Sequence, residues 1–211
     1  MENIAQQTKM IGIIDFGSCN ISSVKNALDF LELKNRIIKG AKDFEGMEKV
    51  ILPGVGSIAS ARNQLTRTGL YDEIVSFCNN PNHSILGICL GMQMLYEWSE
   101  EDGGIEGLGI IKGGVKKIES NSQFKVPNIG WRKCILDQSN PLFVQIEQES
   151  AFYFVHSYKC VTAHKKQVIG QINYSGEINV AVNMLNVFGV QFHPEKSQKC
   201  GLQVLTNFAL L

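Results

Sequence analysis

Short apolar runs alternate with amphipathic segments through the N-terminal half of the chain, and this alternation limits the folds open to it. Residues 11–14, 35–39 and 50–52 have the length and residue types of buried strands, and residues 20–34 carry apolar side chains at helical spacing. The alternation continues with a helical region at 57–78, a strand at 84–88 and a helix at 91–98. Strands bracketed by helices predict an open, mostly parallel α/β sheet flanked by helices, with the functional site at the carboxyl ends of the strands.

After Gly103 the pattern changes to glycine-rich turns and β-like runs that follow each other without intervening helices. These runs are residues 115–118, 152–155, 158–161, 168–174, 180–184 and 187–192. They predict antiparallel additions to the sheet, because successive strands without crossover helices pair most simply as hairpins. Residues 200–211 predict a closing helix. We expect one domain over residues 10–211, preceded by a flexible polar extension at residues 1–9.

Composition excludes several functional classes. The 211 residues include 20 Lys and Arg and 20 Asp and Glu, so no net charge favours binding to nucleic acid or to an anionic membrane. No apolar run approaches the roughly 20 residues that span a bilayer, and the polar leader does not resemble a signal peptide, so we expect a cytoplasmic protein. The six cysteines form no Cys-x-x-Cys pair. We therefore expect free thiols, no metal site and no cofactor.

Cys89 has the sequence context of a catalytic nucleophile. It stands in GICLG (residues 87–91), between an apolar strand and a helix-like segment. This is a Gly-x-Cys-x-Gly version of the nucleophile elbow, a sharp strand-to-helix turn that displays one side chain. The helix start places backbone N–H groups near the sulfur, which favours the reactive thiolate. The sequence therefore predicts an activated cysteine.

A matching base follows in the second half of the chain. Residues 187–192 predict a strand that delivers His193 at its end, and Glu195 comes two residues later. A histidine can take the thiol proton and return it to a leaving amine, while the carboxylate fixes the ring tautomer. A lone cysteine or histidine is more often structural than catalytic. Together these three residues predict a Cys-His-Glu triad.

Acyl transfer also needs donors for the tetrahedral oxyanion. The backbone N–H of Leu90, which follows the nucleophile, is one candidate. The other is the strip Gly54-Val55-Gly56, which follows a predicted strand and whose glycines let a peptide turn its N–H toward a substrate. A plain strand-to-helix turn is the alternative interpretation of this strip.

Four segments resemble those of a known family: PGVG at residues 53–56, GICLGMQ at 87–93, YFVHSY at 153–158 and GVQFHPEK at 189–196. In this order they resemble the class I, triad-type glutamine amidotransferases, and more narrowly the glutaminase subunits of imidazole glycerol phosphate synthase. The resemblance covers Met10 to the C-terminus. It implies that Cys89 forms a γ-glutamyl thioester and that the released ammonia is channelled to a (βα)₈-barrel cyclase subunit in histidine biosynthesis.

The same resemblance implies roles for further residues. Those that would bind L-glutamine are Gln93, Glu101, Ser157 and Tyr158. Those that would face the barrel subunit are Asn20, Pro127, Asn128, Trp131 and Lys196. Glu101 lies in an acidic run, which from composition alone more often indicates a solvated surface than a ligand set. For Trp131 an exposed interface anchor and a buried core residue are equally open.

The chain departs from the family pattern at two places. Cys19 stands where the family generally has glycine, and Arg132-Lys133 follow Trp131 where asparagine is usual. Both changes lie near the implied partner surface, so the acceptor stays open, and an amidotransferase subunit that supplies ammonia for a surface-polysaccharide sugar is the first alternative. A stand-alone cysteine hydrolase is the second. A catalytically silent binding subunit is the third, and the complete triad opposes it.

Overall fold

A computed structural model of the protein describes residues 8–17 and 20–211. Residues 1–7 of the predicted extension, and Cys19, lie outside the described residues. At the end of the extension, Thr8 is buried and Lys9 forms an ion pair with Glu48. These two residues therefore contact the domain, and the boundary of the extension stays a prediction.

Five strands form the parallel half of a large sheet. The N-terminal alternation predicts four of them, whereas the fifth, at residues 187–190, falls in a run predicted as an antiparallel addition and instead pairs in parallel with the strand at residues 84–89. In spatial order they are β2 (Asn35–Ile38), β1 (Ile11–Ile14), β3 (Lys49–Gly54), β4 (Ser84–Cys89) and β14 (Val187–Val190). Every neighbouring pair is parallel. Gly54 lies opposite Cys89 in register. The carboxyl ends of β3, β4 and β14 therefore meet at one edge of the sheet.

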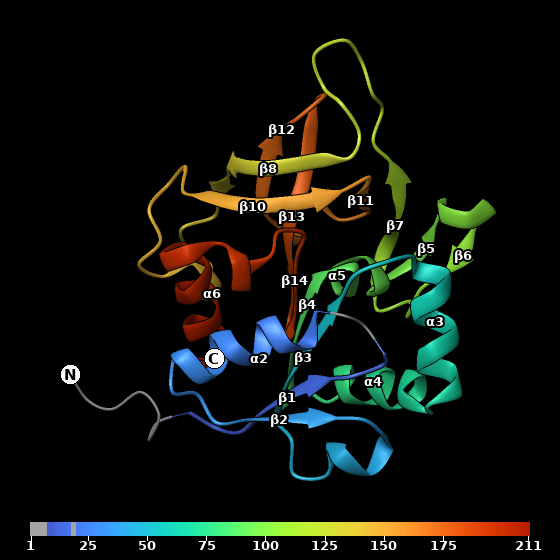
Figure 1. Ribbon diagram of the computed structural model, residues 1–211, viewed down its shortest axis with the longest axis vertical. Coiled ribbons are helices and arrows are strands. Elements are labelled where there is room, and N and C mark those ends of the chain that lie inside the picture. Colours follow the sequence, from blue (N-terminus) through green and yellow to red (C-terminus); the bar gives the residue numbers. More distant parts are fainter. Residues whose placement is uncertain (1–7, 18–19) are drawn as a thin grey trace.

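Four helices cover the two faces of this sheet (Figure 1). The helices α2 (Ile21–Phe30) and α6 (Gln198–Leu210) lie on one face, and α3 (Ile58–Arg67) and α4 (Leu70–Cys78) lie on the other. Along β3, Ile51 packs in the hydrophobic cluster of α2 and α6, whereas its neighbours Val50 and Leu52 pack in the cluster of α3 and α4. The sheet is buried on both faces, which explains its nearly continuous apolar runs.

The C-terminal strands extend the sheet from β14, mostly in antiparallel pairs. After β14 come β13 (Glu177–Met184), β11 (Tyr158–Thr162), β7 (Ile111–Lys117), β5 (Tyr96–Ser99) and β6 (Ile105–Glu106), while β12 (Val168–Asn173) and β9 (Ile135–Leu136) branch from β13. Only β5 and β7 are parallel among these pairs of the described chain. The predicted antiparallel additions are thus confirmed for this part of the sheet.

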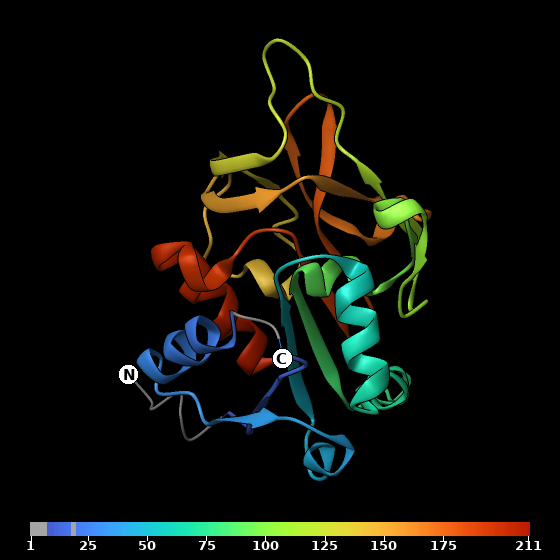
Figure 2. The ribbon, with the colours of Figure 1, turned by 45° about the vertical axis from the view of Figure 1, so that its right-hand side comes forward.

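The predicted strand at 152–155 does not join the main sheet. It is β10 (Ala151–His156), which pairs with β8 (Asn128–Lys133) in a separate two-stranded sheet at the same end of the molecule as β12 (Figures 1 and 2). Phe152, Phe154 and His156 are buried, whereas the residues between them are half-buried. The strand therefore covers the core with one face only, as expected for a ribbon and not for a central strand.

Two helix predictions are wrong in extent. The helix predicted at 91–98 is the short α5 (Leu90–Met94), and β5 follows it at once. The segment is mostly apolar without a clear helical or alternating period, which suits a helix or a strand equally, and pairing with β7 decides for a strand. The helical region at 57–78 is divided into α3 and α4 by Gly69, whose φ of 70° is left-handed and interrupts a helix.

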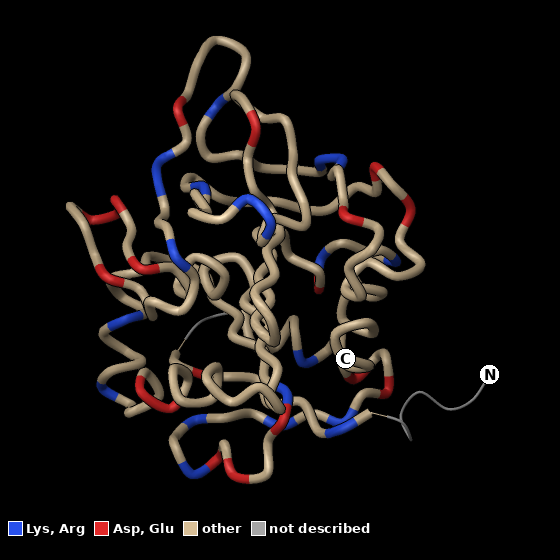
Figure 3. The backbone as a smooth tube through the Cα atoms, turned by 180° about the vertical axis from the view of Figure 1, so that it is seen from behind, with Lys and Arg blue, Asp and Glu red and all other residues tan. Residues whose placement is uncertain are grey.

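Charged residues of both signs are spread along the chain (Figure 3). No helix of the described residues has the length and apolar character needed to cross a bilayer.

Two glycines allow α5 to pack closely against the strands that precede it. A Cβ atom on Gly91 would lie 1.7 Å from the carbonyl oxygen of Leu52 on β3. A Cβ on Gly87 would lie 2.7 Å from the backbone of Gly91. Neither glycine has a positive φ. Close approach of backbones, and not a special backbone conformation, therefore requires glycine at both positions.

We expect Gly91→Ala to lower the free energy of unfolding by about 3 kcal/mol, because the added methyl group collides with backbone that cannot move aside. Urea unfolding followed by circular dichroism measures the change. Gly40→Ala is the matched control, since nothing lies within 4 Å of its Cβ position and its φ is extended. Equal stability of the two variants would contradict the steric explanation.

Candidate active site

Cys89 is the last residue of β4 and the residue that precedes α5. Its φ of 53° and ψ of −107° form a strained conformation for a residue with a side chain. The sharp turn predicted from the sequence is therefore present. The strained residue is Cys89 itself, and Gly87 and Gly91 lie on either side of it. Because α5 has only five residues, its N-terminus favours a thiolate less than the longer predicted helix would.

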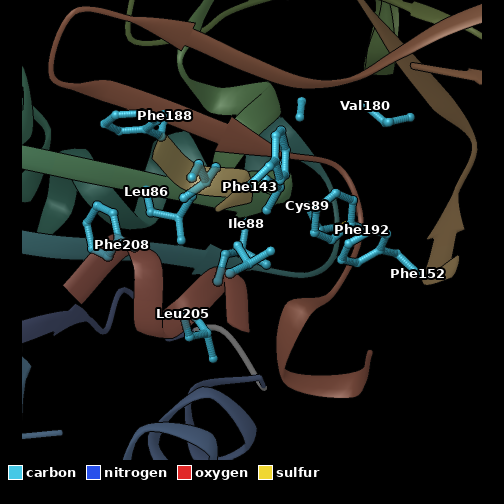
Figure 4. Packing of buried hydrophobic residues seen from close by; sticks show 14 of the residues in the cluster. Leu86, Ile88, Cys89, Phe143, Phe152, Val180, Phe188, Phe192, Leu205 and Phe208 are labelled. Atoms are coloured by element: carbon cyan, nitrogen blue, oxygen red, sulfur yellow. The ribbon is translucent and has the colours of Figure 1, made fainter. Parts of the chain in front are cut away.

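His193 follows β14, the strand next to β4, and is held on several sides. Its backbone N–H donates to the carbonyl of Tyr153 on β10 at 2.9 Å, and its own carbonyl accepts from the Ser197 hydroxyl at 2.6 Å. The preceding residue, Phe192, stacks on Phe152, with ring centroids 4.1 Å apart. Figure 4 shows both rings close to Cys89, in the same hydrophobic cluster. The imidazole therefore has a fixed position beside the elbow.

Glu195 fixes the orientation of this imidazole. His193 Nδ1 donates to Glu195 Oε1 at 2.8 Å, and both side chains are fully buried. Asn20 Nδ2 also donates to Glu195 Oε1. Because Nδ1 is engaged, Nε2 faces away from Glu195. It has no hydrogen-bond partner of normal geometry among the described residues. The predicted His193–Glu195 pair is therefore formed, and its catalytic role with Cys89 stays a prediction.

The charge state of His193 depends on its two neighbours. Burial by itself lowers the pKa of this histidine, but interaction with Cys89 and the hydrogen bond to Glu195 outweigh burial and raise the pKa to about 9. These two neighbours therefore favour the charged form of the ring. Because this pKa exceeds the ordinary value of 6.5, the resulting stabilisation is complete below about pH 6.5 and is lost as the pH rises through about 9.

A pocket of about 360 Å³ opens beside Cys89. The described residues that line it are Val55, Gly56, Cys89, Leu90, Gln93, Glu101, Pro127, Val155, His156, Ser157 and Tyr158. The four residues expected to bind an amino-acid substrate, Gln93, Glu101, Ser157 and Tyr158, are thus gathered around the nucleophile. Their role in binding stays a prediction.

Glu101 is an anchored carboxylate and not a freely solvated one. Its Oε2 accepts from the backbone N–H of Ile58 at 2.8 Å, at the N-terminus of α3. Partial burial raises its pKa, although the bond from Ile58 opposes the rise. The favourable position at a helix N-terminus explains why an acidic side chain is retained at the pocket wall.

The strip Gly54-Val55-Gly56 lies directly beside the elbow. Gly54 is opposite Cys89 in the β3–β4 register, and its Cβ position is 3.1 Å from the Cβ of Leu90. Gly56 has a φ of 104°, a conformation that glycine adopts readily. Val55, Gly56 and Leu90 all line the pocket. Three of the four residues predicted to supply oxyanion donors thus lie at the pocket wall with Cys89, and their role as donors stays a prediction.

His156 is a second buried histidine at the pocket, with the opposite electrostatics. Its Nδ1 donates to the Tyr158 carbonyl at 2.8 Å, so its Nε2 accepts from Asn128 Nδ2 at 3.0 Å. Burial lowers the pKa of His156 to about 4, against the effect of the bond to Tyr158. His156 is therefore neutral at pH 7, in one tautomer, and its two ring nitrogens are both engaged.

The five residues expected to face a partner divide into two groups. Pro127, Trp131 and Lys196 are exposed, and Trp131 has 43% of its surface accessible. Asn20 and Asn128 are buried, 6% and 0% exposed, and contact Glu195 and His156 respectively. The amides of these two side chains are thus engaged inside the protein, and their assignment to a partner surface stays a prediction. Cys19, one of the two departures from the family pattern near this surface, lies outside the described residues.

Sequence reasoning gave no role to two buried residues of this site, Gln191 and His156. Gln191 is fully buried, with its Nε2 3.6 Å from Cys89 Sγ and its Oε1 3.0 Å from Gln93 Nε2. A polar residue in the apolar run before His193 was the available signal, because a buried amide needs partners. For His156 the signal was the alternation with Phe152 and Phe154, which places it on the inner face of β10.

No group of three or more His, Cys, Asp or Glu side chains among the described residues has the arrangement of a metal site. All five cysteines outside the undescribed segments are free thiols.

We expect the ring of His193 to titrate near pH 9, as measured by NMR of its imidazole protons. Replacement of Cys89 by Ala removes the sulfur that favours the charged ring, so the midpoint should fall by about one pH unit or more. His156, which has no such partner, should keep its low midpoint in both proteins. An unchanged His193 midpoint in Cys89→Ala would show that the two side chains do not form a charge pair.

Comparison with known proteins agrees with this geometry. Residues 12–210 match the family model "Glutamine amidotransferase class-I". The chain is 42% identical to the imidazole glycerol phosphate synthase subunit HisH of Leptospira borgpetersenii, over 96% of this chain and 100% of the relative. It is also 42% identical to the HisH subunit of Methanocaldococcus jannaschii, over 96% of this chain and 100% of that one.

Among solved structures, a glutamine amidotransferase superposes with a TM-score of 0.71 at 17% identity, covering 95% of this chain and 99% of the other. The structure titled PurLQS from Thermotoga maritima has the same TM-score at 19% identity, covering 95% of this chain and 97% of the other. At these identities the superpositions support the fold alone. The family model and the relatives together show that the chain belongs to the class I glutamine amidotransferases.

Proposed function

We propose that this protein is the glutaminase subunit of imidazole glycerol phosphate synthase and that it acts in histidine biosynthesis. The observation that carries the proposal is the meeting of Cys89 with the buried His193–Glu195 pair beside a pocket lined by Gln93 and Glu101. Identity of 42% to HisH subunits over their whole length supports the assignment of the pathway.

The reaction begins from a thiolate on Cys89 and an imidazolium on His193. The thiolate attacks the carboxamide carbon of L-glutamine, and the backbone N–H groups of Leu90 and of the Gly54–Gly56 strip stabilise the negative oxygen that forms. His193 gives its proton to the amide nitrogen, the C–N bond breaks, and ammonia leaves. A γ-glutamyl thioester remains on the sulfur.

Neutral His193 then takes a proton from a water molecule that attacks the thioester. Collapse of the second tetrahedral intermediate expels the thiolate and releases glutamate, which restores the starting charges on Cys89 and His193. Glu195 holds the ring in the orientation that serves both steps. Glu101, whose carboxylate lines the pocket, suits the α-amino group of the substrate because their charges are opposite.

The released ammonia passes to a separate (βα)₈-barrel cyclase subunit with which the chain forms a heterodimer. Support comes from Pro127, which lines the pocket and is exposed, and from the exposed pair Trp131 and Ile129 on β8 next to it. A large exposed aromatic side chain is a frequent anchor of protein interfaces. The same complex would act in the cytoplasm, in line with the free thiols.

Replacement of Cys89 by Ala should abolish glutamine-dependent synthesis by the complex and leave ammonia-dependent synthesis nearly unchanged, because the second reaction needs only the cyclase subunit. Both rates are measured with the reconstituted pair. Cys200→Ala is the control, since this thiol lies outside the pocket. Loss of the ammonia-dependent rate in Cys89→Ala would indicate a structural role, and full glutamine-dependent activity would refute the assignment.

Trp131→Ala should weaken binding of the cyclase subunit about tenfold or more, as expected for a central aromatic anchor. Isothermal titration calorimetry gives the affinity. Phe30→Ala on α2 is the matched control, because Phe30 is an even more exposed aromatic residue, at 75%. Equal affinities for the two variants would place the partner elsewhere. Failure of the cyclase subunit to bind the unmodified chain would favour an acceptor such as a polysaccharide sugar or a stand-alone hydrolase.

A further inference from the structure

The side-chain amide of Gln191 lies against the sulfur of Cys89. Gln191 Nε2 is 3.6 Å from Sγ, within hydrogen-bonding range for sulfur, and the side chain is fully buried. The residue follows β14 directly and precedes the segment that carries His193. A buried amide at this place contacts the reacting atom itself.

Neighbouring groups determine which end of this amide faces the sulfur. The carbonyl of Tyr158 can only accept a hydrogen bond, and Gln93 Nε2 lies 3.5 Å from it, so the nitrogen of Gln93 points to that side. The same nitrogen donates to Gln191 Oε1 at 3.0 Å. The oxygen of Gln191 is thereby directed to Gln93, which leaves its NH₂ group directed to Cys89.

We propose that Gln191 is a further catalytic residue, whose N–H donates to Cys89 Sγ and stabilises the thiolate. This role rests on the proposed function, in which Cys89 is the nucleophile. A thiol is a weak acceptor and a thiolate a strong one, so the bond strengthens when the proton leaves the sulfur. Unlike His193, an amide does not take up the thiol proton, so it favours the charged sulfur without competing for the proton.

The short α5 makes such a donor necessary. With five residues, this helix supplies little of the macrodipole that favours thiolates at longer helices. The sulfur also lies near the carbonyl of Val155, at 4.0 Å, which favours a protonated thiol over a thiolate. Gln191 therefore offsets a neighbour that disfavours the reactive form.

A second role is open to a buried glutamine: it fills space and satisfies Gln93 without affecting the sulfur. The two roles differ in the pH dependence of the reactivity of Cys89. The other titratable groups that face or influence this part of the pocket are His193 after β14, Glu195 behind it, His156 on β10, Glu101 before β6, Tyr158 and Cys160 on β11. All of these stay in place when only Gln191 is changed.

The test is the rate at which iodoacetamide alkylates Cys89 as a function of pH in the full-length chain, with mass spectrometry of the peptide that contains Cys89. Gln191→Met removes the donor and keeps the length of the side chain. Gln191→Glu keeps the shape and places a carboxylate beside the sulfur. Gln203→Met on α6, in a different pocket, is the control. Circular dichroism and thermal unfolding verify the fold of each variant.

We expect the midpoint of the alkylation profile to move to higher pH by about one unit in Gln191→Met, as for loss of one hydrogen bond to a charged group. The shift should be larger in Gln191→Glu and absent in Gln203→Met. Unchanged midpoints in both folded Gln191 variants would overturn the proposal and leave Gln191 a core residue.

If one Gln191 variant does not fold, the other variant alone tests the proposal. If neither folds, Gln93→Met tests it, because loss of the donor that orients Gln191 should also raise the midpoint of the alkylation profile.

Alkylation needs no glutamine hydrolysis. A chain without glutaminase activity whose Cys89 still shows the Gln191-dependent shift would refute the proposed function and retain the Gln191–Cys89 interaction. A chain with glutaminase activity whose alkylation midpoint does not depend on Gln191 would refute the Gln191–Cys89 interaction and retain the proposed function.

Discussion

The parallel pairing of β4 with β14 is the constraint on which the site depends. Ile88 lies opposite Val190, so the next residues on the two strands, Cys89 and Gln191, become neighbours, and His193 follows on the same edge. A slip of one residue would turn every side chain of β14 to the other face of the sheet. Burial on both faces of the sheet opposes such a slip, and so the packing of the core also places Cys89, Gln191 and His193 at one edge.

The two buried histidines show how the same fold sets opposite charge states within one pocket. Both lose the solvation that favours a charged ring. His193 regains it from Cys89 and Glu195, whereas His156 meets only a carbonyl and an amide and stays neutral. The strand end that each histidine occupies therefore determines which neighbours its ring meets. His156 lines the pocket, and Asn128 behind it engages the second ring nitrogen.

Much of the fold followed from residue pattern, because the apolar runs of β1, β3 and β4 and the glycines of the elbow each admit few alternatives. The His193–Glu195 pair beside the elbow was predictable because these residues stand in recognisable contexts. The sequence could not separate α5 from β5, since a mostly apolar run without a clear period fits either element. It also could not reveal that the amides of Asn20, Asn128 and Gln191 turn inward, because these contacts join residues far apart in the chain. The resemblance to a family gave Asn20 and Asn128 a role at a partner surface, which stays a prediction, and did not indicate these internal contacts.

The account requires a covalent intermediate on one sulfur, and its detection is the most direct test. The complex with the cyclase subunit would be mixed with L-glutamine, quenched in acid within the first turnover, and digested for mass spectrometry. We predict a glutamyl adduct on Cys89 and on none of the other five cysteines, absent when glutamate replaces glutamine. An active complex in which Cys89 stays unmodified at every quench time, or in which another cysteine carries the adduct, would contradict the account.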